Sequence, residues 1–237
     1  MKFPVRIGVV SAADGSPWVG LQEWLQAKGF DLVPRFFPSY LKQTEALLDG
    51  GIDIAWNGPW AHVQLEALTK GESVSLGMRD SDRDVESLLL CNQKPSPATT
   101  TPPVISTLVA GAGDSPQAYI LPVMHLKDHG LDTRKVDLIR YELEVGKHGE
   151  DNGAAEREVM SHLLGRSSNE LLFGTVSRRE YNQFAYKQDL HVAQTFFPFD
   201  SHQLDCLPSL AIDTRLEFQT LLQSMRPDTS WCAVLWT

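Results

Sequence analysis

The feature that most constrains this chain is a junction between an apolar run and a helix that occurs three times, each time with a proline at the start of the helix. The three runs and their prolines are Arg6–Ser11 with Pro17, Ile52–Trp56 with Pro59, and Ser106–Gly113 with Pro116. Proline suits the first helical position because it has no N–H to lose and its φ is already helical. Strands that alternate with helices run parallel, so we expect three helix N-termini at the carboxyl edge of a sheet, where open α/β proteins bind ligands. Such N-termini favour an anion or a polar group.

The rest of the chain continues this alternation and predicts an α/β protein. The expected strands are residues 5–11, 31–37, 52–56, 74–78, 87–91, 106–112, 136–141, 171–176, 191–195 and 207–212. The expected helices are residues 17–28, 40–48, 60–69, 116–129, 154–164 and 216–225.

A segment rich in proline and threonine, residues 94–103, interrupts the alternation. It can form neither a helix nor a central strand, and is either a surface loop or a connection between two lobes. Because the alternation restarts directly after it, we expect a connection. Residues 1–93 and 200–237 then form the first lobe and residues 104–199 the second. Ligands favour domain interfaces, so we expect the ligand between the lobes.

Composition excludes several classes of function. The formal net charge is −9 and no cluster of Lys and Arg is visible, so nucleic acid is not an expected partner. No apolar run approaches the roughly 20 residues that span a bilayer, so no membrane insertion is expected. The three cysteines fit no zinc or disulfide pattern, and we predict no metal and no cofactor. The printed sequence shows no signal peptide, which predicts a cytoplasmic protein, or a periplasmic one if a leader has been removed.

Two segments resemble the phosphonate- and phosphite-binding proteins of ABC transporters. The stretch IDIAWNGPWAHV is similar to that family's VDVAWLGP segment, and Tyr40 matches the tyrosine that precedes it. The stretch GDSPQAYILPVMHLKDHGLD is similar to the family's second-lobe segment, with Tyr119, Pro122, Leu126 and Gly130 in the matching places. The resemblance implies a two-lobe fold of the type II periplasmic-binding-protein class (a Venus flytrap) with two interlobe crossovers. It also implies a small polar or anionic ligand, and a transporter or signalling protein as partner.

The sequence departs from the family at the residues that grip the phosphonate. The family has Ser-Thr-Ser where this chain has Ser115, Pro116 and Gln117, so one hydroxyl remains and Pro116 offers no N–H. Val85 stands where the family has a tyrosine, and Asn152 where it has a histidine. We therefore expect phosphonate itself to bind weakly.

The candidate ligand-binding residues follow from the strand–proline–helix junctions and from the family resemblance. They are Ser16, Tyr40, Trp56, Asn57, Ser115, Gln117, Asn152 and His202. Ser16 and Ser115 precede helix prolines, where a serine can equally serve only as the N-cap of its own helix. Asn57 can equally be turn chemistry, and Tyr40 can equally pack in the core. His202 precedes the last crossing strand, where the resemblance implies a ligand contact. Arg79, Arg83 and His148 are further positive groups near predicted loops.

An enzyme on the same fold is the alternative, of the chorismate dehydratase or thiamin-pyrimidine synthase type. It would need a general acid or base, with Asp151, His148, His202 or Asp205 as candidates. Cys206 has no second cysteine or histidine cluster to support a metal site, and no arrangement typical of a nucleophile. We predict no catalytic residue and favour a binding protein. A sensing module that acts by contacting a partner protein is a third possibility.

Overall fold

The computed structural model describes residues 3–10, 16–94, 104–113, 115–141, 153–165 and 170–225. Its contacts divide the chain into two compact units. The first unit comprises Met1–Arg83 and Asp200–Thr237, and the second comprises Asp84–Phe199. Each unit is an α/β layer structure built around one five-stranded sheet.

The sheet of the first unit has the strand order β2-β1-β3-β10-β4. Its strands are β1 (Val5–Val10), β2 (Leu32–Phe37), β3 (Ile54–Asn57), β4 (Val74–Met78) and β10 (Gln203–Cys206). Strands β2 and β3 run parallel to β1, and β10 runs antiparallel to both β3 and β4. Pro34 lies in β2 at the edge of the sheet, where a missing N–H is tolerated.

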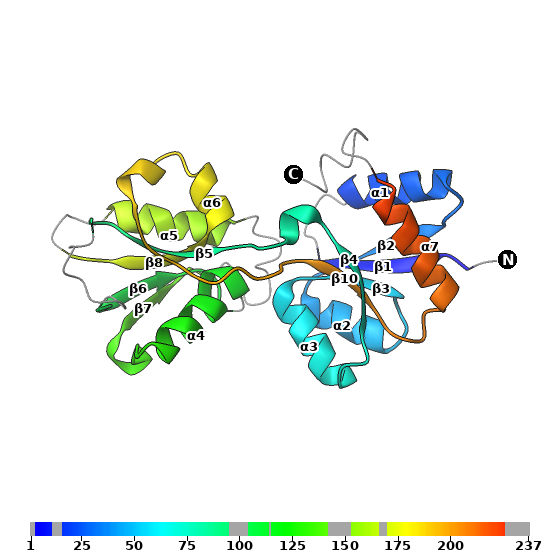
Figure 1. Cartoon of the computed structure of the whole chain (residues 1–237), viewed down its shortest axis with the longest axis horizontal. Coiled ribbons are helices and arrows are strands. Elements are labelled where there is room, and N and C mark those ends of the chain that lie inside the picture. The colour runs from blue at the N-terminus through cyan, green and yellow to red at the C-terminus, as the bar shows by residue number, and fades with distance from the viewer. Residues whose placement is uncertain are drawn as a thin grey trace. The chain divides into compact units, whose positions relative to one another are not determined.

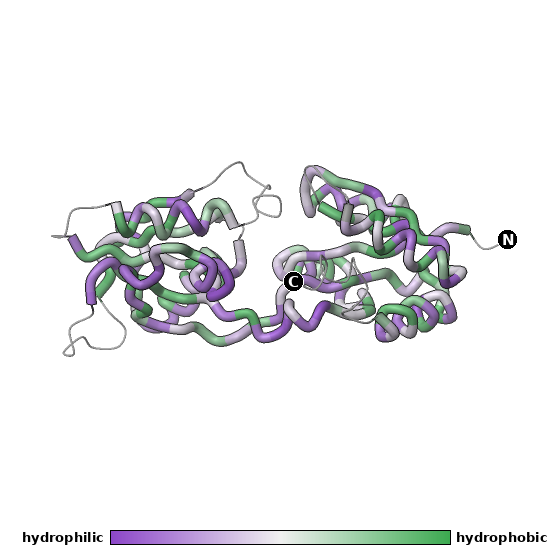
Figure 2. Tube along the Cα trace, turned by 90° about the horizontal axis from the view of Figure 1, so that it is seen from above, coloured by the Kyte–Doolittle hydropathy of each residue, from purple (hydrophilic) through white to green (hydrophobic). Residues whose placement is uncertain are grey.

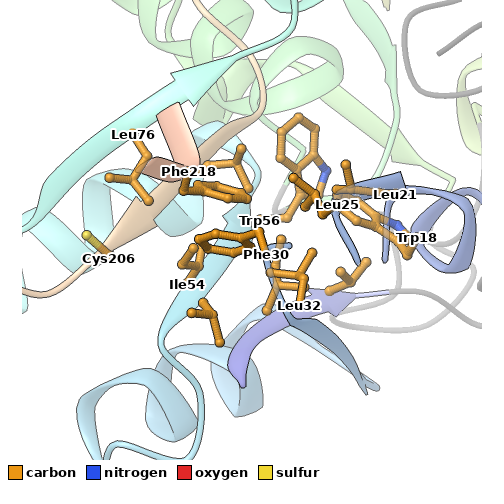
Figure 3. Packing of buried hydrophobic residues seen from close by; sticks show 14 residues of the cluster. Trp18, Leu21, Leu25, Phe30, Leu32, Ile54, Trp56, Leu76, Cys206 and Phe218 are labelled. Carbon is orange, nitrogen blue, oxygen red and sulfur yellow. The ribbon is translucent and has the colours of Figure 1, made fainter. Parts of the chain in front are cut away.

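Helices cover both faces of this sheet. They are α1 (Ser16–Ala27), α2 (Tyr40–Leu48), α3 (Pro59–Thr69) and α7 (Ile212–Gln223), with the short 3₁₀ turn η1 (Asp80–Asp82) after β4. Figure 1 shows α1 and α7 on one face and α2 and α3 on the other. Trp18 and Leu25 of α1 and Phe218 of α7 pack in the core on the first face, and Figure 3 shows this cluster around Trp56. Leu47 of α2 and Leu65 of α3 pack on the second face.

The second unit repeats this plan with its own sheet, in the order β7-β6-β8-β5-β9. Its strands are β5 (Ser87–Cys91), β6 (Thr107–Ala110), β7 (Asp137–Arg140), β8 (Phe173–Ser177) and β9 (His191–Thr195). Strands β7 and β8 run parallel to β6, and β5 runs antiparallel to β8 and β9. The same arrangement, four parallel strands with one reversed strand in the fourth place of the order, therefore occurs in both units.

The helices of the second unit also cover both faces. They are η2 (a π-helix, Pro116–Ile120), α4 (Leu121–Asp128), α5 (Ala154–Gly165) and α6 (Arg178–Gln183), with 3₁₀ turns η3 (Thr133–Lys135) and η5 (Lys187–Asp189). One core holds Val159 and Leu163 of α5, and the other holds Val123 and Leu126 of α4. Figure 2 shows hydrophobic and hydrophilic residues interleaved along these helices, as amphipathic helices require.

Three expectations about the elements need correction. The last strand is β10, not residues 207–212, because Pro208 has no N–H for a central ladder while Gln203–Cys206 pairs on both sides. Strand β5 pairs with β8 and β9 and so belongs to the second unit. The boundary between the units therefore lies before β5, at Asp84, and not after residue 93 as expected. The expected helix 116–129 begins as a π-helix. Residues 95–103 of the expected connection lie outside the described residues.

Candidate functional site

The second unit carries a small pocket at the carboxyl end of β6. Its walls are the residues that follow β6, the first turn of η2 and the first turn of α5. The polar side chains on these walls are Ser115, Gln117 and Glu156. The pocket therefore lies where two helices begin, as the three strand–proline–helix junctions predict for an anion or a polar group.

Pro122 determines how the first of these helices begins. Since Pro122 has no N–H, the carbonyl of Ala118 has no donor four residues further on. That carbonyl instead accepts hydrogen bonds from the backbone N–H of Gly111 and from Thr175 Oγ1. The backbone N–H of Ile120 bonds to Ser115 O at 2.9 Å, five residues back, which is the π-helical pattern. The π turn thus binds the start of the helix to the end of β6 and to β8, and π turns frequently occur at functional sites.

Gly111 allows the close approach that this arrangement needs. A Cβ at residue 111 would lie 2.7 Å from the Cβ of Ala118. The glycine at the end of β6 therefore has a steric role, and the floor of the pocket depends on it.

Two predicted site residues, Ser115 and Gln117, lie in this pocket, and both side chains have partners within the protein. Ser115 is buried and its Oγ accepts a hydrogen bond from the N–H of Ala118 at 3.2 Å, as an N-cap does. Gln117 Nε2 donates to Glu156 Oε1 at 3.2 Å. Asn152, Asp151 and His148 lie outside the described residues.

The first unit brings three predicted residues together at the carboxyl ends of its strands. The hydroxyl of Tyr40, at the start of α2, forms a 3.2 Å hydrogen bond with Nε2 of His202. The His202 ring stacks on Trp56 of β3, with centroids 5.5 Å apart and an interplanar angle of 12°. The Arg79 guanidinium lies 4.9 Å from the centre of the Trp56 ring, a cation–π distance. We call Tyr40, Trp56, Arg79 and His202 the aromatic–histidine cluster.

Asp82 contacts two members of this cluster, Arg79 and His202. It is buried and forms an ion pair with Arg79, and Nδ1 of His202 lies 3.8 Å from its Oδ1. Burial alone would raise the pKa of Asp82, but the attraction of His202 and the hydrogen bonds from Arg79 outweigh it and lower the pKa. The carboxylate therefore stays charged and holds the side chains of Arg79 and His202 in place.

Asn57, a further predicted ligand contact, is instead part of a buried polar network. Its Nδ2 donates to Asp205 Oδ2 at 2.8 Å, and its Oδ1 accepts from Gln43 Nε2 at 2.9 Å. Asp205, which is fully buried, also accepts from Ser75 Oγ at 2.9 Å and lies 3.1 Å from Nδ1 of His62. The pairing of β10 with β4 shifts its register between Leu204 and Asp205, at the residue that carries this buried carboxylate. The Asn57 side chain thus acts inside the protein and positions the end of β3.

The remaining candidates lie apart from these groups or act in packing. Arg83 is exposed, and α1 begins at Ser16. Burial raises the pKa of the Cys206 thiol to about 11, so it stays protonated near neutral pH and packs in the core instead of acting as a nucleophile. Among the described residues, no group of three or more His, Cys, Asp or Glu could hold a metal ion.

Sequence reasoning missed Glu156, Asp82 and Gln43. Glu156 carried a usable signal, because it falls on the buried stripe of α5 that continues through Val159 and Leu163. A charged residue on such a stripe indicates either a partner or a site. Asp82 and Gln43 had no comparable signal, since their burial depends on contacts with residues far away in the sequence.

Two α/β units, each with the sheet order just described and each with a polar site at the carboxyl ends of its strands, define a type II periplasmic-binding-protein fold. A comparison with protein families matches residues 16–152, more than half of the chain, to the phosphonate periplasmic substrate-binding proteins of ABC transporters. The chain belongs to this family of ligand-binding transport components. A search of curated proteins gave no match.

Solved structures show the same fold at low sequence identity. PhnD1 from Prochlorococcus marinus, solved in complex with methylphosphonate, has a TM-score of 0.67 and 11% identity over 98% of this chain and 88% of its own. A binding-protein component of an ABC phosphonate transporter from Pseudomonas aeruginosa has a TM-score of 0.58 and 15% identity, covering 98% and 80%. The aliphatic sulphonate-binding protein of Escherichia coli has a TM-score of 0.55 and 15% identity, covering 94% and 71%. These comparisons do not support the enzyme alternatives. No helix in the described part of the chain is long and apolar enough to cross a membrane.

Proposed function

We propose that this protein binds a small molecule with an oxyanion group, which occupies the small pocket of the second unit. The observation that carries the proposal is the meeting of two helix starts, η2 and α5, at one pocket beyond β6. The first N–H groups of a helix lack partners within the helix and carry partial positive charge, so they favour an oxyanion. Methylphosphonate in the Prochlorococcus structure is a ligand of this chemistry.

In the first unit we propose ligand contacts at Tyr40, Trp56 and His202. The Tyr40 hydroxyl and the His202 imidazole already share a hydrogen bond, and Trp56 supports the imidazole by stacking. Such groups combine an apolar face with a polar tip, which suits a small organic anion. Asn57 contributes by holding the end of β3 through Asp205.

We expect the affinity for methylphosphonate to be modest. Of the residues at the start of η2, only Ser115 has a hydroxyl, and its Oγ already accepts a bond from Ala118. Pro116 offers no N–H and Gln117 donates to Glu156. The pocket therefore has fewer free donors than a loop with three hydroxyls.

The family description is of a periplasmic component of ABC importers. We propose the periplasm as the place of action and an ABC transporter as the partner.

Calorimetric titration with methylphosphonate tests the proposal. The wild type should bind, and Tyr40→Ala should weaken binding by at least about tenfold because it removes both the hydroxyl and the support of His202. Lys42→Ala on the exposed side of the same helix is the matched control and should bind as the wild type does. Equal affinity in Tyr40→Ala and Lys42→Ala would contradict the proposed contact. The appearance of a conversion product over hours would favour the enzyme alternative.

A further inference from the structure

Glu156 is a buried carboxyl in a pocket that is otherwise suited to anions. It is the third residue of α5 and only 5% exposed, on the helix face that continues through Val159 and Leu163. Together with Ser115 and Gln117 it forms the polar lining of the second-unit pocket. Buried carboxylates normally pair with a cation.

The hydrogen bonds that Glu156 accepts come from neutral groups. Its Oε1 accepts a hydrogen bond from Gln117 Nε2 at 3.2 Å, and its Oε2 accepts one from the backbone N–H of Ser177. A carboxyl group has about four acceptor positions when ionised, and gains a donor when protonated. Glu156 therefore keeps hydrogen-bonding capacity for a group that enters the pocket.

Among the described residues, the charged groups around Glu156 do not neutralise it. Glu180 of α6 is a like charge that acts on Glu156, and Arg157 is paired with Glu180 at 2.8 Å. Arg178, next to Ser177, is paired with Glu86. Strands β6 and β8 carry no titratable side chain, and η2 contributes only Tyr119, whose ring packs against Arg140.

This setting favours the protonated carboxyl. Burial raises the pKa of Glu156, repulsion from Glu180 adds to the effect, and the hydrogen bonds from Ser177 and Gln117 oppose it. The group is therefore able to exchange a proton at a pH where an exposed glutamate is fully ionised.

An ionised carboxylate and a fully ionised oxyanion repel each other in a small pocket. One proton between them replaces the repulsion with a short, charge-assisted O–H···O⁻ hydrogen bond. We propose that Glu156 is a specificity-determining residue, which shares one proton with the bound oxyanion and so selects oxyanions that can bring a proton. This inference rests on the proposed function and deepens it.

The proposal separates phosphonates from sulfonates. A phosphonate monoanion has a P–OH group that can donate to ionised Glu156. A sulfonate has no proton near neutral pH, so it needs Glu156 in its protonated form. As pH rises through the pKa of Glu156, the affinity for a sulfonate should fall by about tenfold per pH unit, while a phosphonate monoanion continues to bind.

The test is a calorimetric titration of the wild type with methylphosphonate and with methanesulfonate between about pH 5 and about pH 8. We expect the ratio of the two affinities to change by at least about tenfold in favour of methylphosphonate as pH rises. In Glu156→Gln, whose amide donates without titrating, the affinity for methanesulfonate should no longer depend on pH. Glu158→Gln, on the exposed side of the same helix, is the matched control and should behave as the wild type does.

Each outcome is decisive. A constant ratio in the wild type, or the same pH dependence in Glu156→Gln, would overturn the role of Glu156 while leaving the proposed function standing. If neither ligand binds to the wild type at any pH, the proposed function fails and this inference fails with it. Should Glu156→Gln not fold, the wild type alone decides, because titration in buffers of different ionisation enthalpy counts the protons taken up. We expect uptake of about one proton with methanesulfonate above the pKa of Glu156 and less with methylphosphonate.

Discussion

At the scale of single residues, the molecule uses buried polar groups to fix the ends of its strands. Asp205 is fully buried, and its hydrogen-bond partners come from β3, β4 and α3. A buried carboxylate is costly unless its oxygens accept hydrogen bonds. The network around Asp205 therefore stabilises a single backbone position at the end of β3. Trp56, which stacks on His202 in the aromatic–histidine cluster, lies at this end of the strand.

Replacing Asn57 with alanine should destabilise the first unit. The change removes one of the hydrogen bonds of Asp205 and one of those of Gln43 inside a buried network, which costs about 1–3 kcal/mol of unfolding free energy. Urea denaturation measures the loss, and Gln64→Ala on the exposed face of α3 is the control. If Asn57→Ala were as stable as Gln64→Ala, the network would have no structural role. We also expect weaker ligand binding, because the end of β3 would lose its support.

The residues of the site could be predicted only in part. Tyr40, Trp56 and His202 come together in one unit, and Ser115 and Gln117 line one pocket. Strand ends and helix starts can be predicted from local sequence, which is why the sequence could place Trp56, Ser115 and Gln117 near such ends, whereas Tyr40 and His202 came from the family resemblance. That these residues contact a ligand stays a prediction. Partners such as Asp82 and Gln43 depend on the tertiary fold, so no local pattern identifies them. The burial of Asn57 was missed for the same reason.

At the scale of elements, one proline and one glycine shape the start of the helix that forms the pocket. Pro122 leaves the Ala118 carbonyl available to Gly111 and Thr175, and Gly111 leaves room for Ala118. The sequence predicted a helix from Pro116 but not its π turn. The turn depends on Pro122, whose missing N–H leaves the Ala118 carbonyl without its usual helical donor. Strand β10 was misplaced because its buried Asp205 breaks the apolar pattern that marks a strand.

The variant Gly111→Ala should therefore push η2 away from β6. Its Cβ would lie 2.7 Å from that of Ala118, and overpacking of this kind costs about 1–3 kcal/mol. Gly77→Ala in β4 is the matched control, since a Cβ there meets nothing within 4 Å. Thermal unfolding compares the two, and calorimetry should show weaker ligand binding only in Gly111→Ala. Equal stability and equal binding in both variants would refute the steric role of Gly111.

At the scale of the whole molecule, two units with the same strand order carry separate cores. The α/β class could be predicted because both sheets alternate with helices in the sequence. The membership of β5 could not, because it is decided by pairing with β8 and β9, which come much later in the chain.

Separate cores predict that a cavity in one unit affects that unit first. Leu163→Ala in the second unit and Leu25→Ala in the first each remove a buried side chain, at a cost of about 2–5 kcal/mol. Amide hydrogen exchange should show faster exchange in β6 and β8 for Leu163→Ala, and in β1 and β3 for Leu25→Ala. The same pattern of acceleration in both variants would mean that the units open as one.

The central claim is that this member of the phosphonate-binding family holds a small oxyanion. Thermal unfolding of the wild type in methylphosphonate, phosphate, methanesulfonate and acetate, at matched ionic strength against chloride, tests it most directly. We expect a higher unfolding midpoint with at least one of the phosphorus oxyanions, since a ligand at about 100 times its Kd adds about 2.7 kcal/mol of stability. An unchanged midpoint with every anion, up to the solubility limit of each salt, would show that the protein does not hold a small oxyanion.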